Sequence, residues 1–135
     1  MDFAGMNYLA ILAAAIAAFA FGGAYYGLLG KPWMKAARIN PDQVHMSPAP
    51  FISSFIAELV MAWVLAGIIG HLGTGQVTVW NGLVSGAFVW LGFMATTIAV
   101  NHRYQGFGWY LTLIDAGHWL GVALIMGAVI GWFGV

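Results

Sequence analysis

Long apolar segments alternate with short polar connections along the 135 residues of this chain. Four such segments run roughly over residues 8–29, 51–71, 77–100 and 107–133. Each exceeds the roughly 20 residues that a helix rising about 1.5 Å per residue needs to cross the hydrocarbon core of a bilayer. The pattern predicts an all-α membrane protein, with four transmembrane helices in a compact bundle and a single domain over residues 1–135.

The second and third segments are separated by a turn rather than by charge. No Asp, Glu, Lys or Arg lies between Leu59 and His102, and this stretch is too long for one membrane-spanning helix. Gly70, Gly73 and Gly75 interrupt the stretch and favour a turn. We therefore expect two helices here, joined by a short loop.

The composition of the chain supports a membrane location. Apolar residues make up 62% of it and charged residues 6%, whereas about 25% of a soluble domain is charged. The lipid bilayer is therefore its expected surrounding.

The absence of cysteine excludes disulfides and thiolate metal sites. The four basic residues are too few to follow a nucleic-acid backbone, so nucleic acid is not an expected partner.

The basic residues predict the orientation of the helices. Lys31, Lys35 and Arg38 lie in the first connection and Arg103 lies in the third, so all four share one side of the membrane. Short cytoplasmic loops carry an excess of Lys and Arg. We therefore expect a multi-pass protein of the bacterial cytoplasmic (inner) membrane, with both termini and the turn at residues 70–76 outside.

The first connection has an amphipathic start. Residues 32–39 are predicted to form a short interfacial helix between the first and second transmembrane helices, because proline favours the first turn of a helix. Its apolar and basic side chains would face lipid tails and phosphates respectively. The expected contacts with the lipid surface come from Lys31, Trp33, Lys35 and Arg38.

Glycines four residues apart predict close helix packing. Such pairs let two backbones approach each other in lipid. They allow packing within one chain and packing between chains, so self-association through at least one pair stays open. The pairs are Gly23 with Gly27, Gly82 with Gly86, Gly117 with Gly121, and Gly127 with Gly131.

Candidate chemistry gathers in the half of the membrane nearer the basic loops. Glu58 is the only charged residue in the first three apolar segments. Glu58 and Asp115 both lie roughly 10 Å deep when counted from that side at about 1.5 Å per residue. His118 lies one helical turn beyond Asp115. Polar residues at similar depth complete the predicted cluster, namely Ser54, Thr96, His102 and Thr112.

We expect the side chains of Glu58, Asp115 and His118 to converge between the second, third and fourth helices. Lipid offers neither acid a partner, and charged residues inside a membrane are functional by default. A shared proton would make the cluster a proton or cation relay. The alternatives are that Glu58 reaches the interface and that Asp115 with His118 is only a packing pair.

Metal and haem chemistry have weaker support. Glu58, Asp115, His118 and His102 are ligand types suited to iron or zinc, yet the repeated Glu-x-x-His pairs of di-metal bundles are missing. The histidines differ in depth, which argues against haem. No Walker A loop or nucleophile elbow occurs. We therefore expect no catalytic residue, no metal and no other cofactor.

The chain resembles a bacterial membrane family called domain of unknown function 1761. The resemblance covers most of the chain and rests on residues 6–10, residues 26–34, and His118 followed by residues 122–128. It implies four spans and a histidine in the last one, and it implies no particular reaction. Similar proteins more often carry a neutral amide where Asp115 stands, which sets Asp115 apart from a shared mechanism.

The sequence favours a non-enzymatic membrane protein that acts as a small homo-oligomer or as an accessory (scaffold or assembly) subunit of a larger membrane complex. The alternative is a proton-coupled small-solute carrier or channel that uses Glu58, Asp115 and His118. A membrane metalloenzyme is a third hypothesis. These functions differ in what they demand of the three residues, since a carrier fails without them and a scaffold only loosens.

Overall fold

The computed structural model describes residues 6–134 as an all-helical protein with four helices long and apolar enough to cross a membrane. The first is α1 (Tyr8–Ala36), the second is α2 (Ala49–Gly70), the third runs over Val79–Tyr104, and the last is α5 (Trp109–Phe133). The predicted fold class is confirmed, and each predicted span overlaps one of these helices.

The third span changes its winding at the centre. It consists of α3 (Val79–Val89), a π-helical segment η3 (Trp90–Ala95) and α4 (Thr96–Tyr104). The indole Nε1 of Trp90 donates a hydrogen bond of 2.7 Å to the Ala116 carbonyl of α5. Segments of π-helix commonly occur at functional sites, and this one lies beside the polar part of α5.

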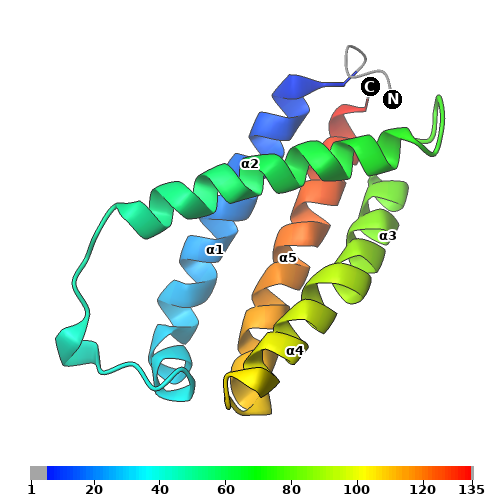
Figure 1. Ribbon diagram of the computed structural model, residues 1–135. Coiled ribbons are helices and arrows are strands. Elements are labelled where there is room, and N and C mark those ends of the chain that lie inside the picture. The colour runs from blue at the N-terminus through cyan, green and yellow to red at the C-terminus, as the bar shows by residue number, and fades with distance from the viewer. Residues whose placement is uncertain (1–5, 135) are drawn as a thin grey trace.

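Three of the spans lie side by side, and the fourth crosses them (Figure 1). The helix α5 is in the middle, with α1 on one side and α3 and α4 on the other. The helix α2 runs obliquely across this layer and packs mainly against α1. The helices are therefore tightly packed where α2 contacts its neighbours, and they are loosely packed at the start of α2.

The last turns of α1 and α4, which carry Lys35 and Arg103, and the connections that follow them lie at one end of the bundle, opposite the start of α1 and the end of α5 (Figure 1). Arg38 joins the two connections, since its Nη2 donates a 2.7 Å hydrogen bond to the carbonyl of Gly106. Its guanidinium also lies 4.5 Å from the centre of the Phe107 ring. Arg38 was expected at lipid phosphates, and here it bonds to another loop of the protein.

The helix predicted over residues 32–39 is not separate in the structure. The helix α1 continues through Pro32 to Ala36, and the backbone turns at Arg38 with φ of 58°. A proline inside a helix removes one hydrogen bond and does not always end it. The short helix between α1 and α2 is instead the 3₁₀ turn η2 (Pro41–Gln43).

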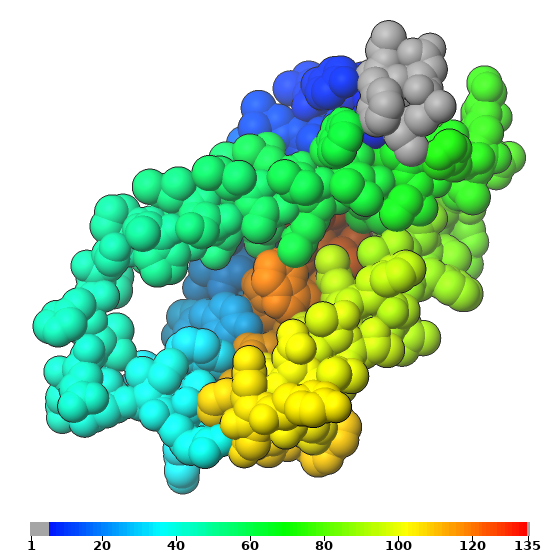
Figure 2. Space-filling model, in the orientation of Figure 1, coloured from blue at the N-terminus to red at the C-terminus, as the bar shows by residue number. Residues whose placement is uncertain are grey.

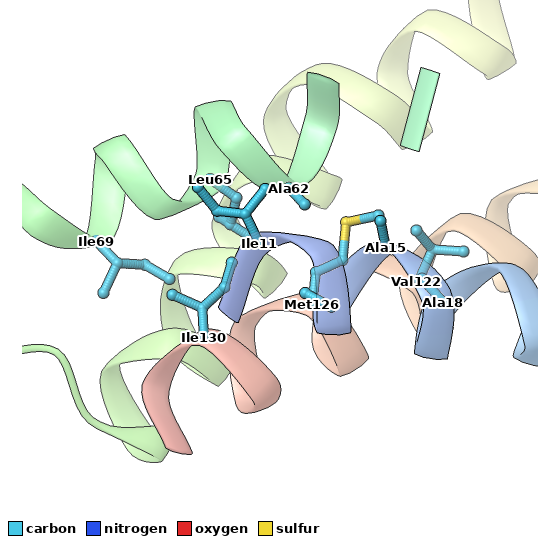
Figure 3. Close-up of a cluster of buried hydrophobic side chains, with 10 residues drawn as sticks. Ile11, Ala15, Ala18, Ala62, Leu65, Ile69, Val122, Met126 and Ile130 are labelled. Atoms are coloured by element: carbon cyan, nitrogen blue, oxygen red, sulfur yellow. The ribbon is translucent and has the colours of Figure 1, made fainter. Parts of the chain in front are cut away.

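The apolar core lies between the first half of α1 and the later halves of α2 and α5 (Figure 3). The first half of α1 contributes mostly alanines, which let the neighbouring helices approach closely. The second halves of α2 and α5 contribute larger side chains. Its members are Ile11, Ala14, Ala15, Ala18, Ala62, Leu65, Ile69, Val122, Met126 and Ile130.

Six of the eight glycines predicted to pack helices do so within this chain. A Cβ atom on Gly82 would collide with the backbone of Gly127, and one on Gly127 would collide with Gly82. Gly86 and Gly131 likewise bring α3 and its N-cap against α5, while Gly117 and Gly121 meet tyrosine and phenylalanine rings of α1. A Cβ on Gly23 or Gly27 of α1 meets nothing within 4 Å, so these two pack no helix in the protomer.

The backbone contact between α3 and α5 predicts a strong effect of one methyl group. Gly82→Ala should lower the free energy of unfolding by about 1–3 kcal/mol or more, because overpacking forces the two helices apart. The measurement is thermal or denaturant unfolding of the protein in detergent micelles, together with its size. The matched control is Gly27→Ala, which adds a methyl in open space. Equal stability of the two variants, or conversion of an oligomer to monomer by Gly82→Ala alone, would contradict intramolecular packing.

Candidate functional site

The helix faces that form the apolar core continue one turn further toward the end of the bundle where the basic residues lie, which we call the basic end. At this turn the faces carry polar side chains. The next positions are Gly22 on α1, Glu58 on α2 and His118 on α5. They lie four residues from core members of the same helices, and residues four apart share one helical face. Those core members are Ala18, Ala62 and Val122. Three helices therefore direct these positions toward one place.

A cavity of about 360 Å³ lies at this place, between α1, α2 and α5. Glu58 lines it and is only 2% exposed. Its Oε2 atom is buried and has no hydrogen-bond partner within residues 6–134. Figure 2 shows the chain hollowed on this side, where the first turns of α2 and the preceding connection stand away from α1. The other lining residues are Phe19, Gly22, Gly23, Tyr26, Gly27, Phe51, Ser54, His118 and Trp119.

His118 is enclosed by aromatic rings. Its ring stacks on Phe21 with centroids 6.1 Å apart and an interplanar angle of 6°, and it lies 4.6 Å from Trp119. A Cβ atom on Gly22 would lie 2.8 Å from its Nε2, so only glycine leaves room for the ring there. The Nδ1 atom is buried, again with no partner among the described residues. His118 therefore has a fixed position and an unused ring nitrogen.

Asp115 lies outside this cavity and has several partners. Its Oδ1 accepts hydrogen bonds from the hydroxyl of Tyr26 at 2.7 Å and from the indole Nε1 of Trp33 at 3.0 Å. Its Oδ2 lies 3.4 Å from Nε2 of His102. Trp33 reaches Asp115 because α1 continues past Pro32, so the residue expected in lipid instead donates a hydrogen bond to a partly buried acid.

A second chain of polar contacts leads from Asp115 to the basic end. The Nη2 of Arg103 donates to the hydroxyl of Thr112 at 2.6 Å, and that hydroxyl lies 2.9 Å from Nδ1 of His102. Arginine can only donate, so Thr112 accepts there and can direct its own proton at His102. The Nε2 of His102 then carries the hydrogen that faces Asp115. The guanidinium of Arg103 lies 3.8 Å from the centre of the Trp109 ring.

Tyr26 connects the cavity with the Asp115 contacts. Its ring lines the cavity and lies 4.8 Å from the ring of His118, measured between centroids. Its hydroxyl donates to Asp115. A single side chain thus contacts both polar groups, through its ring on one side and its hydroxyl on the other.

The single predicted cluster is two groups in the structure. Glu58 and His118 share the cavity with Ser54, while Asp115 bonds with His102 through a different set of contacts. Among residues 6–134, no hydrogen bond joins Glu58 directly to Asp115 or to His118. The helices separate the two acids because α2, which carries Glu58, crosses the layer instead of running parallel to α5.

Thr96 belongs to neither group. It is exposed, and its hydroxyl donates to the carbonyl of Gly92 in its own helix at 2.8 Å. Thr97 does the same with Phe93 at 2.6 Å. Both bonds satisfy the hydroxyls at the end of the π-helical segment, which explains two polar side chains near that irregular winding.

Tyr26, Trp33 and Arg103 are site residues that the sequence interpretation missed. Trp33 was assigned to the interface because Pro32 was taken to start a new helix. Tyr26 lies in the last turns of α1, at the basic end and near Asp115. That shared depth could have identified Tyr26 as a donor to the acid. In the sequence interpretation, Arg103 served only to predict the orientation of the helices in the membrane.

The four residues considered as metal ligands do not form a ligand set. Within the part of the chain that the structure describes, no three His, Asp or Glu side chains lie close enough together to hold a metal ion. Glu58 faces the cavity, and His102 and Asp115 form a pair outside it.

The fold and the site define a helical protein of the membrane-spanning class with an internal polar site. The chain belongs to the family described as "Protein of unknown function (DUF1761)", which it matches over residues 9–131. The matched range includes every residue of the cavity and of the Asp115 contacts. No curated protein and no solved structure matches this chain.

The contact between Gly22 and His118 predicts a position-specific clash. Gly22→Ala should lower the free energy of unfolding by about 1–3 kcal/mol relative to Gly30→Ala, because the new methyl displaces an enclosed ring. Gly30 lies in the same helix, and a Cβ there meets nothing within 4 Å. Combining Gly22→Ala with His118→Ala should recover much of this loss in a double-mutant cycle measured by unfolding in detergent. Additive losses would show that the methyl and the ring do not meet.

Proposed function

We propose that this protein is a proton-coupled carrier or channel for small solutes in the bacterial cytoplasmic membrane, with its basic connections on the cytoplasmic side. Its role is transfer across the membrane, without covalent catalysis. The four apolar spans and the single-sided basic residues support this location. The polar groups described above support the activity.

One observation carries the proposal, namely the buried and unpartnered oxygen of Glu58 at a cavity. Leaving a polar atom without a hydrogen bond costs roughly 1–3 kcal/mol in proteins. Asp115, by contrast, receives two hydrogen bonds and faces a histidine. A purely structural acid would be paired in the way Asp115 is, so the open position of Glu58 favours a partner that comes and goes.

The proposed proton path runs from the cavity to the basic end. Glu58 and His118 are the groups that would exchange protons with a solute in the cavity. Tyr26 would pass a proton to Asp115, with which it already forms a 2.7 Å hydrogen bond. From there, His102 leads to Thr112. A cavity of this size has room for a bridging water between Glu58 and the Tyr26 hydroxyl.

A scaffold or assembly subunit is the second candidate, and the open glycines of α1 favour it. Gly23 and Gly27 have no neighbour within 4 Å on the side where a Cβ would point. Most residues in the first two turns of α2 are exposed beside them. A helix of another protein could pack into this place. Such a subunit has no need for proton transfer, so the experiment below separates the two functions.

Proton movement should depend on Asp115. In liposomes containing the protein and an internal pH dye, an imposed membrane potential should drive protons faster than in protein-free liposomes. Asp115→Asn should lower the protein-dependent rate by roughly a hundredfold, within the range lost with a positioned proton-transfer group. Asp42→Asn is the matched control, because it removes an exposed acid from the turn η2.

The control variant should keep the rate of the unchanged protein. Equal rates in liposomes with and without protein would overturn the transport proposal and favour the scaffold. A rate that is high but unaffected by Asp115→Asn would overturn the proposed path.

A further inference from the structure

We propose that the cavity between α1, α2 and α5 binds a small amphipathic ammonium, meaning a protonated amine attached to an apolar body. The inference names the solute class of the carrier proposed above and depends on that proposal for its transport role. The binding itself depends only on the cavity. Its volume of about 360 Å³ falls within the range of about 300–1,000 Å³ typical of small-molecule sites.

The charge in the cavity selects a cation. Glu58 is the only acidic residue that lines it, and no lysine or arginine is among its lining residues in the described chain. An anion would therefore face a carboxylate without a compensating positive group. A protonated amine would supply both the opposite charge and the hydrogen-bond donor that Oε2 of Glu58 has in no described contact.

His118 is a second polar residue of the cavity, and this favours a ligand with more than one hydrogen to donate. The Nδ1 of His118 is buried without a partner, and the residue lines the same cavity as Glu58. A primary ammonium has three N–H donors. It can serve a carboxylate and an imidazole together, whereas a quaternary ammonium has no hydrogen to donate to either.

The walls of the cavity favour an apolar body and contribute further attraction to the charge. Aromatic rings line it from all three helices, with Phe19 and Tyr26 on α1, Phe51 on α2 and Trp119 on α5. The faces of such rings attract cations, and their apolar surface suits an aryl or alkyl group. Gly22, Gly23 and Gly27 add no side chains to the α1 wall beside Phe19 and Tyr26.

The test is the binding of 2-phenylethylamine to the protein in phosphatidylglycerol nanodiscs, measured by equilibrium dialysis with empty nanodiscs as the blank. Binding of the neutral analogue 2-phenylethanol shows how much of the affinity depends on the positive charge. We expect the amine to bind at least about tenfold more tightly than the alcohol, a factor that corresponds to about 1.4 kcal/mol. Equal affinities would overturn the proposal.

Two variants remove the site in different ways. Glu58→Gln keeps the shape and removes the charge, and Gly23→Leu fills the cavity from a position where a Cβ meets nothing within 4 Å. Each should weaken amine binding by about tenfold or more. Asp42→Asn and Gly30→Leu are the matched controls outside the cavity and should bind as the unchanged protein does. Full amine affinity in Glu58→Gln with retained helicity would overturn the proposal.

A lipid headgroup carries the same chemistry, since phosphatidylethanolamine ends in a primary ammonium. Replacing part of the nanodisc lipid with phosphatidylethanolamine distinguishes the sources. A weaker apparent affinity for the amine would assign the site to the headgroup, and an unchanged affinity would assign it to a free solute. Binding without proton flux would overturn only the transport function, and proton flux without binding would overturn only this inference.

Discussion

Hydrocarbon offers no hydrogen-bond partner, and this constraint determines where the polar side chains of this protein lie. The oxygens of Asp115 accept hydrogen bonds from donors in two turns of α1 and face His102. Trp90 and Tyr25 meet the constraint by donating to carbonyls of α5. These bonds connect α5 with the helices on both of its sides. Among the described residues, buried polar atoms of Glu58, His118 and Arg103 have no hydrogen-bond partner, and of these three residues Glu58 and His118 line one cavity.

Much of the fold was predictable because it depends on patterns within single helices. Apolar length, the glycine turn after α2 and the positions of the basic residues were enough to predict four spans and a shared end for all four basic residues. The partners of the glycines were not predictable, since Gly82 and Gly127 recognise each other across two helices distant in sequence. Spacing alone does not say whether such a pair meets its own chain or another. The continuation of α1 through Pro32, which brings Trp33 to Asp115, was also missed, because proline at this position was taken to start a new helix.

The candidate site was predictable in its residues and not in its grouping. Depth along each helix correctly placed Glu58, Asp115 and His118 in the same half of the protein. Depth carries no information about the angle at which α2 crosses the other helices, and that angle separates Glu58 from Asp115. Tyr26 joins the two groups through its ring and its hydroxyl. Shared depth makes Tyr26 a candidate donor to Asp115, but predicting that its ring also lines the cavity would have required knowledge of which face of α1 meets α5.

Selective modification of Glu58 tests the central claim most directly, namely that one acid is held unpaired at an apolar cavity while the other is satisfied. Dicyclohexylcarbodiimide is an apolar reagent that adds to carboxyl groups in apolar surroundings, and mass spectrometry of peptides locates the adduct. The account predicts one adduct on Glu58 and none on Asp115, whose oxygens are occupied by Tyr26, Trp33 and His102. An adduct on Asp115 with Glu58 unmodified would contradict it.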